Sequence, residues 1–214
     1  MSHAIPTLSR VPASEKGLTI ADFLVPIRVG EAASPRLRHV GLIIAGALLI
    51  FLTARVSIPI PGNPVPFTLQ NFGILVVGGA LGMRRGGLAA LLYVALGVVG
   101  LPFFAEGKGG LTVIIGATGG YLVGFIVAAA LVGRLAELGW DRRIGGAIGA
   151  TALGTAVIYA IGVPWLAVVT GLSASEAIAT GLLPFLIGDV VKLLLAAAVF
   201  PAAWWVVGRR PSDR

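Results

Sequence analysis

The sequence contains no cysteine and little charge. Its 214 residues are 57% hydrophobic and only 12% charged, whereas soluble domains are about 45–50% apolar and about 25% charged. The absence of cysteine excludes disulfides, thiol catalysis and zinc–thiolate sites. A chain with so little charge cannot cover a water-exposed surface, and one this hydrophobic cannot be disordered. The composition therefore indicates an integral membrane protein whose solvent is the lipid bilayer.

Histidine and enzymatic motifs are also scarce. His3 and His39 both precede the first long apolar run, which excludes a histidine-based catalytic dyad within the membrane. The chain has neither a His-Glu-x-x-His nor a Gly-x-Ser-x-Gly motif. Residues 107–112 resemble a phosphate-binding loop only faintly, because no Ser or Thr follows Lys108. We therefore predict that the protein is not an enzyme and needs no metal and no cofactor.

Six apolar segments follow residue 36. Each is long enough, or nearly so, to cross a hydrocarbon layer of about 30 Å as a helix rising about 1.5 Å per residue. They cover about residues 40–54 with an extension past Arg55 toward Ile60, then 68–83, 86–105, 111–133, 144–163 and 182–207. A spanning segment must satisfy its own backbone hydrogen bonds, which favours helices. The sequence predicts an all-α integral membrane protein with six transmembrane helices.

This fold divides the chain into three parts. Residues 1–36 form a cytoplasmic N-terminal tail, residues 37–208 the membrane domain and residues 209–214 a cytoplasmic C-terminal tail. Within the first tail, residues 18–29 are predicted to form a short surface helix, which Pro26 would interrupt. The tail does not have the character of a secretory signal, because no basic start leads into an apolar core.

Basic residues predict the orientation. If six helices alternate from a cytoplasmic N-terminus, thirteen Lys and Arg residues fall on the cytoplasmic side. Only Arg55 and Lys108 then lie outside, and Lys192 lies within the membrane. This strong positive-inside bias places both termini in the cytoplasm and the chain in the cell inner (plasma) membrane as a multi-pass protein. The net charge of +7 therefore reflects topology and does not predict a nucleic-acid partner.

Asp189 and Lys192 are the strongest candidate site. Each charge costs about 2.5–3.5 kcal/mol at the centre of a membrane helix. Their spacing of three puts them on one face, about two turns below the predicted outer end of the sixth helix, where they can pair. Either the pair is a packing device that orients the helix, or it marks a polar ligand site or ion path. A ligand site would suit a molecule with amide or ureido N–H groups, a carbonyl or carboxylate, and an apolar remainder.

The predicted outer ends of the helices add further candidates. Thr68 and Gln70 place a hydroxyl and an amide there, with helix capping and a headgroup position as the alternatives. Lys108 either closes over a ligand or is a solvated loop charge, and Tyr121 either covers a ligand or anchors the interface. The predicted substrate-binding residues are Asp189, Lys192, Tyr121, Lys108, Gln70, Thr68 and Gly120.

Five motifs occur in a fixed order along residues 38–208. They are PVPFTLQ (64–70), GALGMRRG (79–86), GLPFFA (100–105), GATGGYLVGF (116–125) and DVVK (189–192). In this order and spacing they resemble the BioY family, the biotin-binding S-components of energy-coupling factor (ECF) transporters.

The resemblance implies a six-helix membrane fold that captures biotin from outside. It implies partners as well: a transmembrane coupling protein and two ABC-type ATPase subunits. It places Asp189 and Lys192 in contact with the ligand, and Lys108 is the candidate for the ligand carboxylate because Leu122 follows Tyr121 where the family can carry an arginine. The small-residue docking face of the first helix has its nearest match at Gly41 and Ala45.

Other functions remain as alternatives. The chain can be a self-sufficient proton-coupled carrier with Asp189 as the proton site, or an S-component for a different vitamin. A membrane scaffold without transport is a further possibility. Uptake in cells without any ATPase partner, abolished by an uncoupler, would indicate the carrier.

Overall fold

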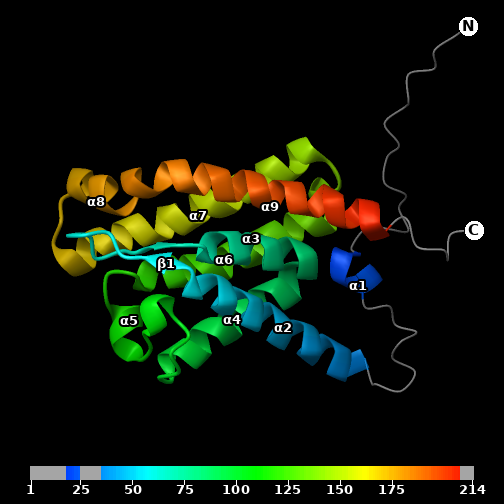
Figure 1. Ribbon diagram of the computed structural model, residues 1–214, viewed down its shortest axis with the longest axis horizontal. Coiled ribbons are helices and arrows are strands. Elements are labelled where there is room, and N and C mark those ends of the chain that lie inside the picture. Colours follow the sequence, from blue (N-terminus) through cyan, green and yellow to red (C-terminus); the bar gives the residue numbers. More distant parts are fainter. Residues whose placement is uncertain (1–17, 25–34, 208–214) are drawn as a thin grey trace, which may run out of the picture.

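The computed structural model describes residues 18–24 and 35–207 and is mainly helical there (Figure 1). The main helices are α2 (Pro35–Arg55), α3 (Gln70–Leu81), α4 (Met83–Val98), α6 (Gly119–Glu137), α7 (Ile144–Thr170) and α9 (Leu186–Val207). Shorter elements are α1 (Ile20–Leu24), α5 (Leu111–Ile115), α8 (Ala174–Gly181) and the 3-10 turns η3 (Ala105–Gly107), η4 (Trp140–Arg142) and η5 (Leu183–Phe185). Strands β1 (Ser57–Ile58) and β2 (Phe67–Thr68) pair antiparallel.

Within this described part, four helical stretches are long and apolar enough to cross a membrane. They are Arg36–Arg55, Gly119–Glu137, Ile144–Thr170 and Ala174–Val207. The predicted helical membrane character is thus confirmed at the level of a mainly helical chain with four candidate spans.

Helices α3 and α4 are shorter than predicted, with 12 and 16 residues. Helix α3 begins only after β2 and ends at Gly82, whose φ of 84° breaks the helical path. Helix α4 ends just before Gly100, which has a φ of 105°. The predicted segments 68–83 and 86–105 were therefore wrong in extent, because turn-forming backbone at their ends takes residues out of the helices.

Helix α6 is the central element of the bundle and packs against α3, α4 and α7. Glycines allow this close approach. A Cβ on Gly78 would lie 2.6 Å from the carbonyl oxygen of Ala129, and one on Gly124 would lie 3.0 Å from Cα of Ile158. Small residues let membrane helices come close enough for van der Waals packing and interhelical hydrogen bonds, which drive association where lipid supplies no hydrophobic force.

The two ends of the bundle differ (Figure 1). One end carries β1, α5 and α8, while the other carries α1 and the C-terminal end of α9. The proline-rich segment between the strands is extended and turned, as its prolines predict. Asn63 fastens it to α8, because its Nδ2 donates to the carbonyl of Thr180 at 2.8 Å. At this end the proline-rich segment is therefore hydrogen-bonded to α8.

Helix α1 forms within the segment predicted to be a surface helix, but its position is not on the surface. Ile20 and Ala21 are only 2% and 4% exposed, and α1 packs against α3 and α9. The prediction of a helix was correct for residues 20–24. The predicted surface location was wrong, because these apolar side chains are buried against the end of the bundle. Residues 1–17, 25–34 and 208–214, which hold most of both predicted tails, lie outside the described residues.

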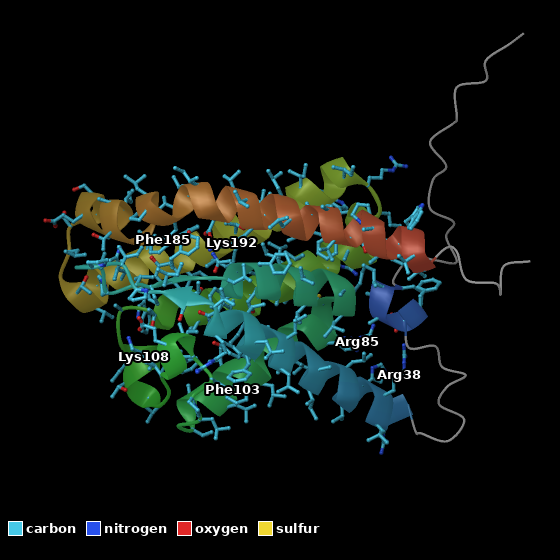
Figure 2. The ribbon with its side chains drawn as sticks, viewed as in Figure 1. Arg38, Arg85, Phe103, Lys108, Phe185 and Lys192 are labelled. Carbon is cyan, nitrogen blue, oxygen red and sulfur yellow. The ribbon has the colours of Figure 1, made fainter. Side chains whose placement is uncertain are left out.

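Asp22 holds α1 in place. Its carboxylate accepts hydrogen bonds from Arg85 Nη2 at 2.8 Å, from Arg38 Nη2 at 3.0 Å and from the backbone N–H of Thr19 at 3.1 Å. Figure 2 shows Arg38 and Arg85 at this end of the ribbon. Burial alone would raise the pKa of Asp22, but the hydrogen bonds and charge of Arg85, with those from Thr19, bring that pKa well below its ordinary range.

We expect Asp22→Asn to lower the free energy of unfolding by about 1–3 kcal/mol, because Arg85 and Thr19 lose a charged, partly buried acceptor. The lowered pKa of Asp22 means that this stability is present above its unfolded value of about 3.9 and is lost as pH falls through the folded value. Thermal unfolding in detergent should show a gap between wild type and variant at neutral pH that narrows below about pH 4.

Arg134→Gln is the matched control. Its ion pair with Glu137 is 3.3 Å long and the arginine side chain is 55% exposed, so its loss should change the unfolding temperature little. Equal unfolding temperatures for wild type and Asp22→Asn at neutral pH would contradict a stabilising role of the Asp22 carboxylate.

Candidate ligand-binding site

A cavity of about 330 Å³ lies among the loops at the end of the bundle away from α1. Pockets for small ligands generally have volumes of about 300–1,000 Å³. Its walls come from the 64–71 segment, the loop around η3, α5, and helices α6, α7 and α9. Figure 2 places Lys108, Phe185 and Lys192 toward this end, opposite Arg38 and Arg85.

Asp189 and Lys192 form one wall of the cavity. Helix α9 begins at Leu186, because residues 183–185 form the separate turn η5. Asp189 therefore lies in the first turn of α9, and the predicted depth of about two turns was wrong. The partial positive charge of a helix N-terminus favours a carboxylate at this position.

The predicted pairing of the two charges is confirmed. Lys192 Nζ donates to Asp189 Oδ1 at 2.7 Å, and the two side chains are 6% and 4% exposed. The lysine ammonium also lies 3.7 Å from the centroid of the Phe67 ring, a cation–π contact. Removing two charges from water is costly, and this geometry offsets that cost while both groups face the cavity.

Two neutral donors complete the surroundings of Asp189. Asn71 Nδ2 donates to Oδ2 at 2.8 Å, and the Tyr159 hydroxyl donates to the same oxygen. Sequence analysis did not select either residue. Two sequence features could have indicated them: the amide of Asn71 directly follows Gln70, and the phenol of Tyr159 lies within an otherwise apolar segment.

Gln70 and Thr68 also line the cavity. Gln70 is 5% exposed, and its Nε2 donates to the hydroxyl of Tyr93 at 2.5 Å. The alternative of a headgroup position for Gln70 is therefore wrong. Thr68 lies in β2, and its Oγ1 accepts from the backbone N–H of Gln70 at 3.3 Å. This weak turn bond replaces a helix cap, since the cap position of α3 is Leu69.

Tyr121 is buried and lines the cavity, so it is not an interfacial anchor. Its hydroxyl donates to the carbonyl of Gly181 at 2.8 Å. A Cβ on Gly162 or Gly181 would overlap the tyrosine side chain, so both glycines make room for it. Gly120 does not line the cavity: a Cβ there would meet the side chain of Trp165.

Lys108 lies at the open side of the site and its side chain is 61% exposed. It pairs with Glu106, and both residues line the cavity. The loop is held by its backbone, since the N–H of Phe104 donates to the carbonyl of Lys108 at 3.0 Å. This arrangement leaves an exposed cation beside the cavity, and exchanging the partner of an exposed ion pair costs little.

The remaining lining residues missed by sequence analysis are mainly small or apolar. They include Thr112, Thr118, Phe104, Leu122, Phe125 and Phe185. The site therefore combines one ion pair with amide, hydroxyl and phenol groups on an apolar background. Such a cavity suits a small ligand with a polar head, an apolar body and an anionic end. In the described ranges no group of three or more His, Cys, Asp or Glu side chains could hold a metal.

Fold and site together define a helical membrane protein that binds a small molecule in a cavity at one end of its bundle. Residues 27–209 match the model of the BioY family. The chain belongs to the BioY family, as its motifs predict.

Named relatives agree with this assignment. The chain is 42% identical over 162 residues to the biotin transporter BioY of Thermotoga maritima, covering 74% of this chain and 92% of the relative. It is 39% identical over 175 residues to the biotin transporter BioY of Rhodobacter capsulatus, covering 76% and 90%. A crystal structure of the S-component for biotin from an ECF-type ABC transporter superposes with a TM-score of 0.71 at 26% identity, covering 78% of this chain and 90% of that one.

We expect Gly162→Ala to lower both the unfolding temperature and ligand affinity, because the added methyl group displaces Tyr121 from the cavity wall. Gly145→Ala, in the same helix, is the control: a Cβ there has nothing within 4 Å. Alanine is about 1 kcal/mol better than glycine in a helix, so the control should be neutral or slightly stabilising. A Gly162→Ala protein with the unfolding temperature of the control would refute this packing.

Proposed function

We propose that this protein is the substrate-binding membrane subunit for biotin uptake, which captures biotin from outside the cell for ATP-driven delivery inward. The observation that carries the proposal is the Asp189–Lys192 pair facing a cavity in a chain of the BioY family. Relatives that the chain covers almost end to end are biotin transporters. The family is one of transporter components and not of enzymes.

Biotin has the three chemical features that the cavity suits. Its ureido head carries adjacent N–H donors and a carbonyl acceptor, which complement a carboxylate and an ammonium. Its fused ring system is apolar and suits walls such as Phe104 and Phe185. Its carboxylate suits Lys108 at the open side of the site. Tyr121, Gln70 and Thr68 line the space between these ends.

Six membrane crossings and cytoplasmic termini belong to the same proposal. Helices α3 and α4 would complete the crossings together with the four longer stretches, within a membrane domain of residues 37–208 flanked by tails 1–36 and 209–214. Arg38 and Arg85 lie at the end away from the cavity, in keeping with a cytoplasmic location of that end in the inner (plasma) membrane. The cavity would then open outward.

Delivery into the cell requires partners, because the sequence holds no ATP-binding motif of its own. We propose a transmembrane coupling protein and two ABC-type ATPase subunits. The similar S-component comes from an ECF-type ABC transporter. Gly41 and Ala45 are exposed on one face of α2, and such small residues permit close approach of a partner helix.

We expect Asp189→Asn and Lys192→Ala each to weaken biotin binding at least about tenfold, or about 1.4 kcal/mol. Each change removes one charge of the ion pair and leaves the other buried charge without its counter-charge. Calorimetric titration of the purified proteins with biotin measures the effect. Arg134→Gln, far from the cavity, should bind biotin like the wild type.

Two further measurements separate the alternatives. Titration with a panel of other vitamins would reveal an S-component for a different ligand, if one of them binds more tightly than biotin. Biotin uptake in cells without the ATPase subunits, abolished by an uncoupler, would replace the proposal with a proton-coupled carrier. Unchanged biotin affinity in both site variants would reject the proposed site.

A further inference from the structure

Donors from three separate helices surround the carboxylate of Asp189. Lys192 belongs to α9 like Asp189 itself, Asn71 comes from α3 and Tyr159 from α7. The tyrosine and the asparagine donate to Oδ2, while the lysine donates to Oδ1. One carboxylate thus joins three walls of the cavity, and its orientation is determined by groups far apart in the sequence.

The number of hydrogen bonds decides which oxygen can meet a ligand. A carboxylate oxygen has two lone pairs. Oδ2 already accepts two hydrogen bonds from Asn71 and Tyr159, whereas Oδ1 accepts one from Lys192 among the bonds of the described residues. The remaining acceptor direction is therefore on Oδ1, next to the ammonium of Lys192. That ammonium has three N–H donors, so it retains capacity beyond its bond to Asp189.

Tyr159 is suited to this role because its ring is fixed independently of its hydroxyl. The ring packs edge-to-face on Tyr121, with centroids 6.2 Å apart and an interplanar angle of 89°. Tyr121 directs its own hydroxyl to the carbonyl of Gly181. The chain therefore has two tyrosines in mutual contact in the same cavity wall, and only one of them holds Asp189.

We propose that Tyr159 is a positioning residue: with Asn71 it occupies Oδ2 of Asp189, so that Oδ1 and the Lys192 ammonium face the ligand as one acceptor beside one donor. The inference rests on the proposed function and adds a specificity determinant to it. Without the Tyr159 hydroxyl, the carboxylate can rotate and offer either oxygen, and the fixed order of acceptor and donor is lost. Tyr159 acts through Asp189, and its hydroxyl need not touch the ligand.

A double-mutant cycle tests this directly. Tyr159→Phe keeps the ring and removes the hydroxyl, and we expect it to weaken biotin binding about tenfold, as loss of a hydrogen bond to a charged group does. In an Asp189→Ala background, the same change should cost less than about twofold, because the group that Tyr159 positions is absent. Calorimetric titration of the wild type, the two single variants and the double variant with biotin gives the coupling free energy between Tyr159 and Asp189.

Tyr121→Phe is the matched control. It removes the neighbouring hydroxyl, which bonds to Gly181 and not to Asp189, so its cost should be the same in both backgrounds. If Asp189→Ala is not recovered folded, Asp189→Asn replaces it, because its single carbonyl oxygen cannot reproduce the contacts of both carboxylate oxygens. Equal costs of Tyr159→Phe with and without the carboxylate, or no cost in the wild-type background, would overturn the proposal.

The same variants separate this inference from the function on which it rests. Failure of the wild type to bind biotin would reject the proposed function alone. Unfolding temperatures without ligand would then decide the inference. Tyr159→Phe should lower the unfolding temperature when Asp189 is present and leave it nearly unchanged in Asp189→Ala, whereas equal shifts in both backgrounds would reject the positioning role.

Discussion

Two opposite charges, on Asp189 and Lys192, lie one helical turn apart in a bundle whose other helical faces are largely apolar. A buried charge is tolerated only when partners replace its water. Here the replacement comes from each other, from Asn71 and Tyr159, and from the Phe67 ring. The two charges can pair within α9 alone, but their other partners belong to β2, α3 and α7, so the full set forms only when all four elements are in place. The ion pair and the cavity wall are thus one structural unit.

Close packing of backbones maintains that unit. Glycines at helix contacts let the backbones of α3, α6 and α7 approach closely with no side chain between them, as at Gly78 and Gly124. At the cavity the same principle makes room for aromatic rings, since Gly162 and Gly181 accommodate Tyr121 and Gly188 accommodates Phe67. Rigid helices then hold polar groups at fixed distances, which loops alone do not achieve.

The opposite end of the bundle also relies on an ion cluster. Asp22 joins the short α1 to Arg85 of α4 and Arg38 of α2, and Phe23 packs edge-to-face on Trp204 of α9. Residues 18–24 lie outside the segment 27–209 that matches the family model. An ion cluster of this kind fixes the ends of helices whose central parts are held by packing.

The membrane class, the location of the main helices and most of the polar lining could be predicted from the sequence. Long apolar runs, and charges within them, can be read from each segment alone, because the length and polarity that the bilayer requires do not depend on neighbouring segments. Other features could not be predicted in this way. Turns set the helix ends at Gly82 and Gly100 and the first-turn position of Asp189, and tertiary packing buries α1. Asn71 and Tyr159 became site residues only through folding, because a hydrogen bond between α3, α7 and α9 has no trace in the local pattern of any one of them. The sequence by itself determined that two charges had to be satisfied within an apolar bundle, and only the tertiary structure decided which donors satisfy them and which atoms remain for a ligand.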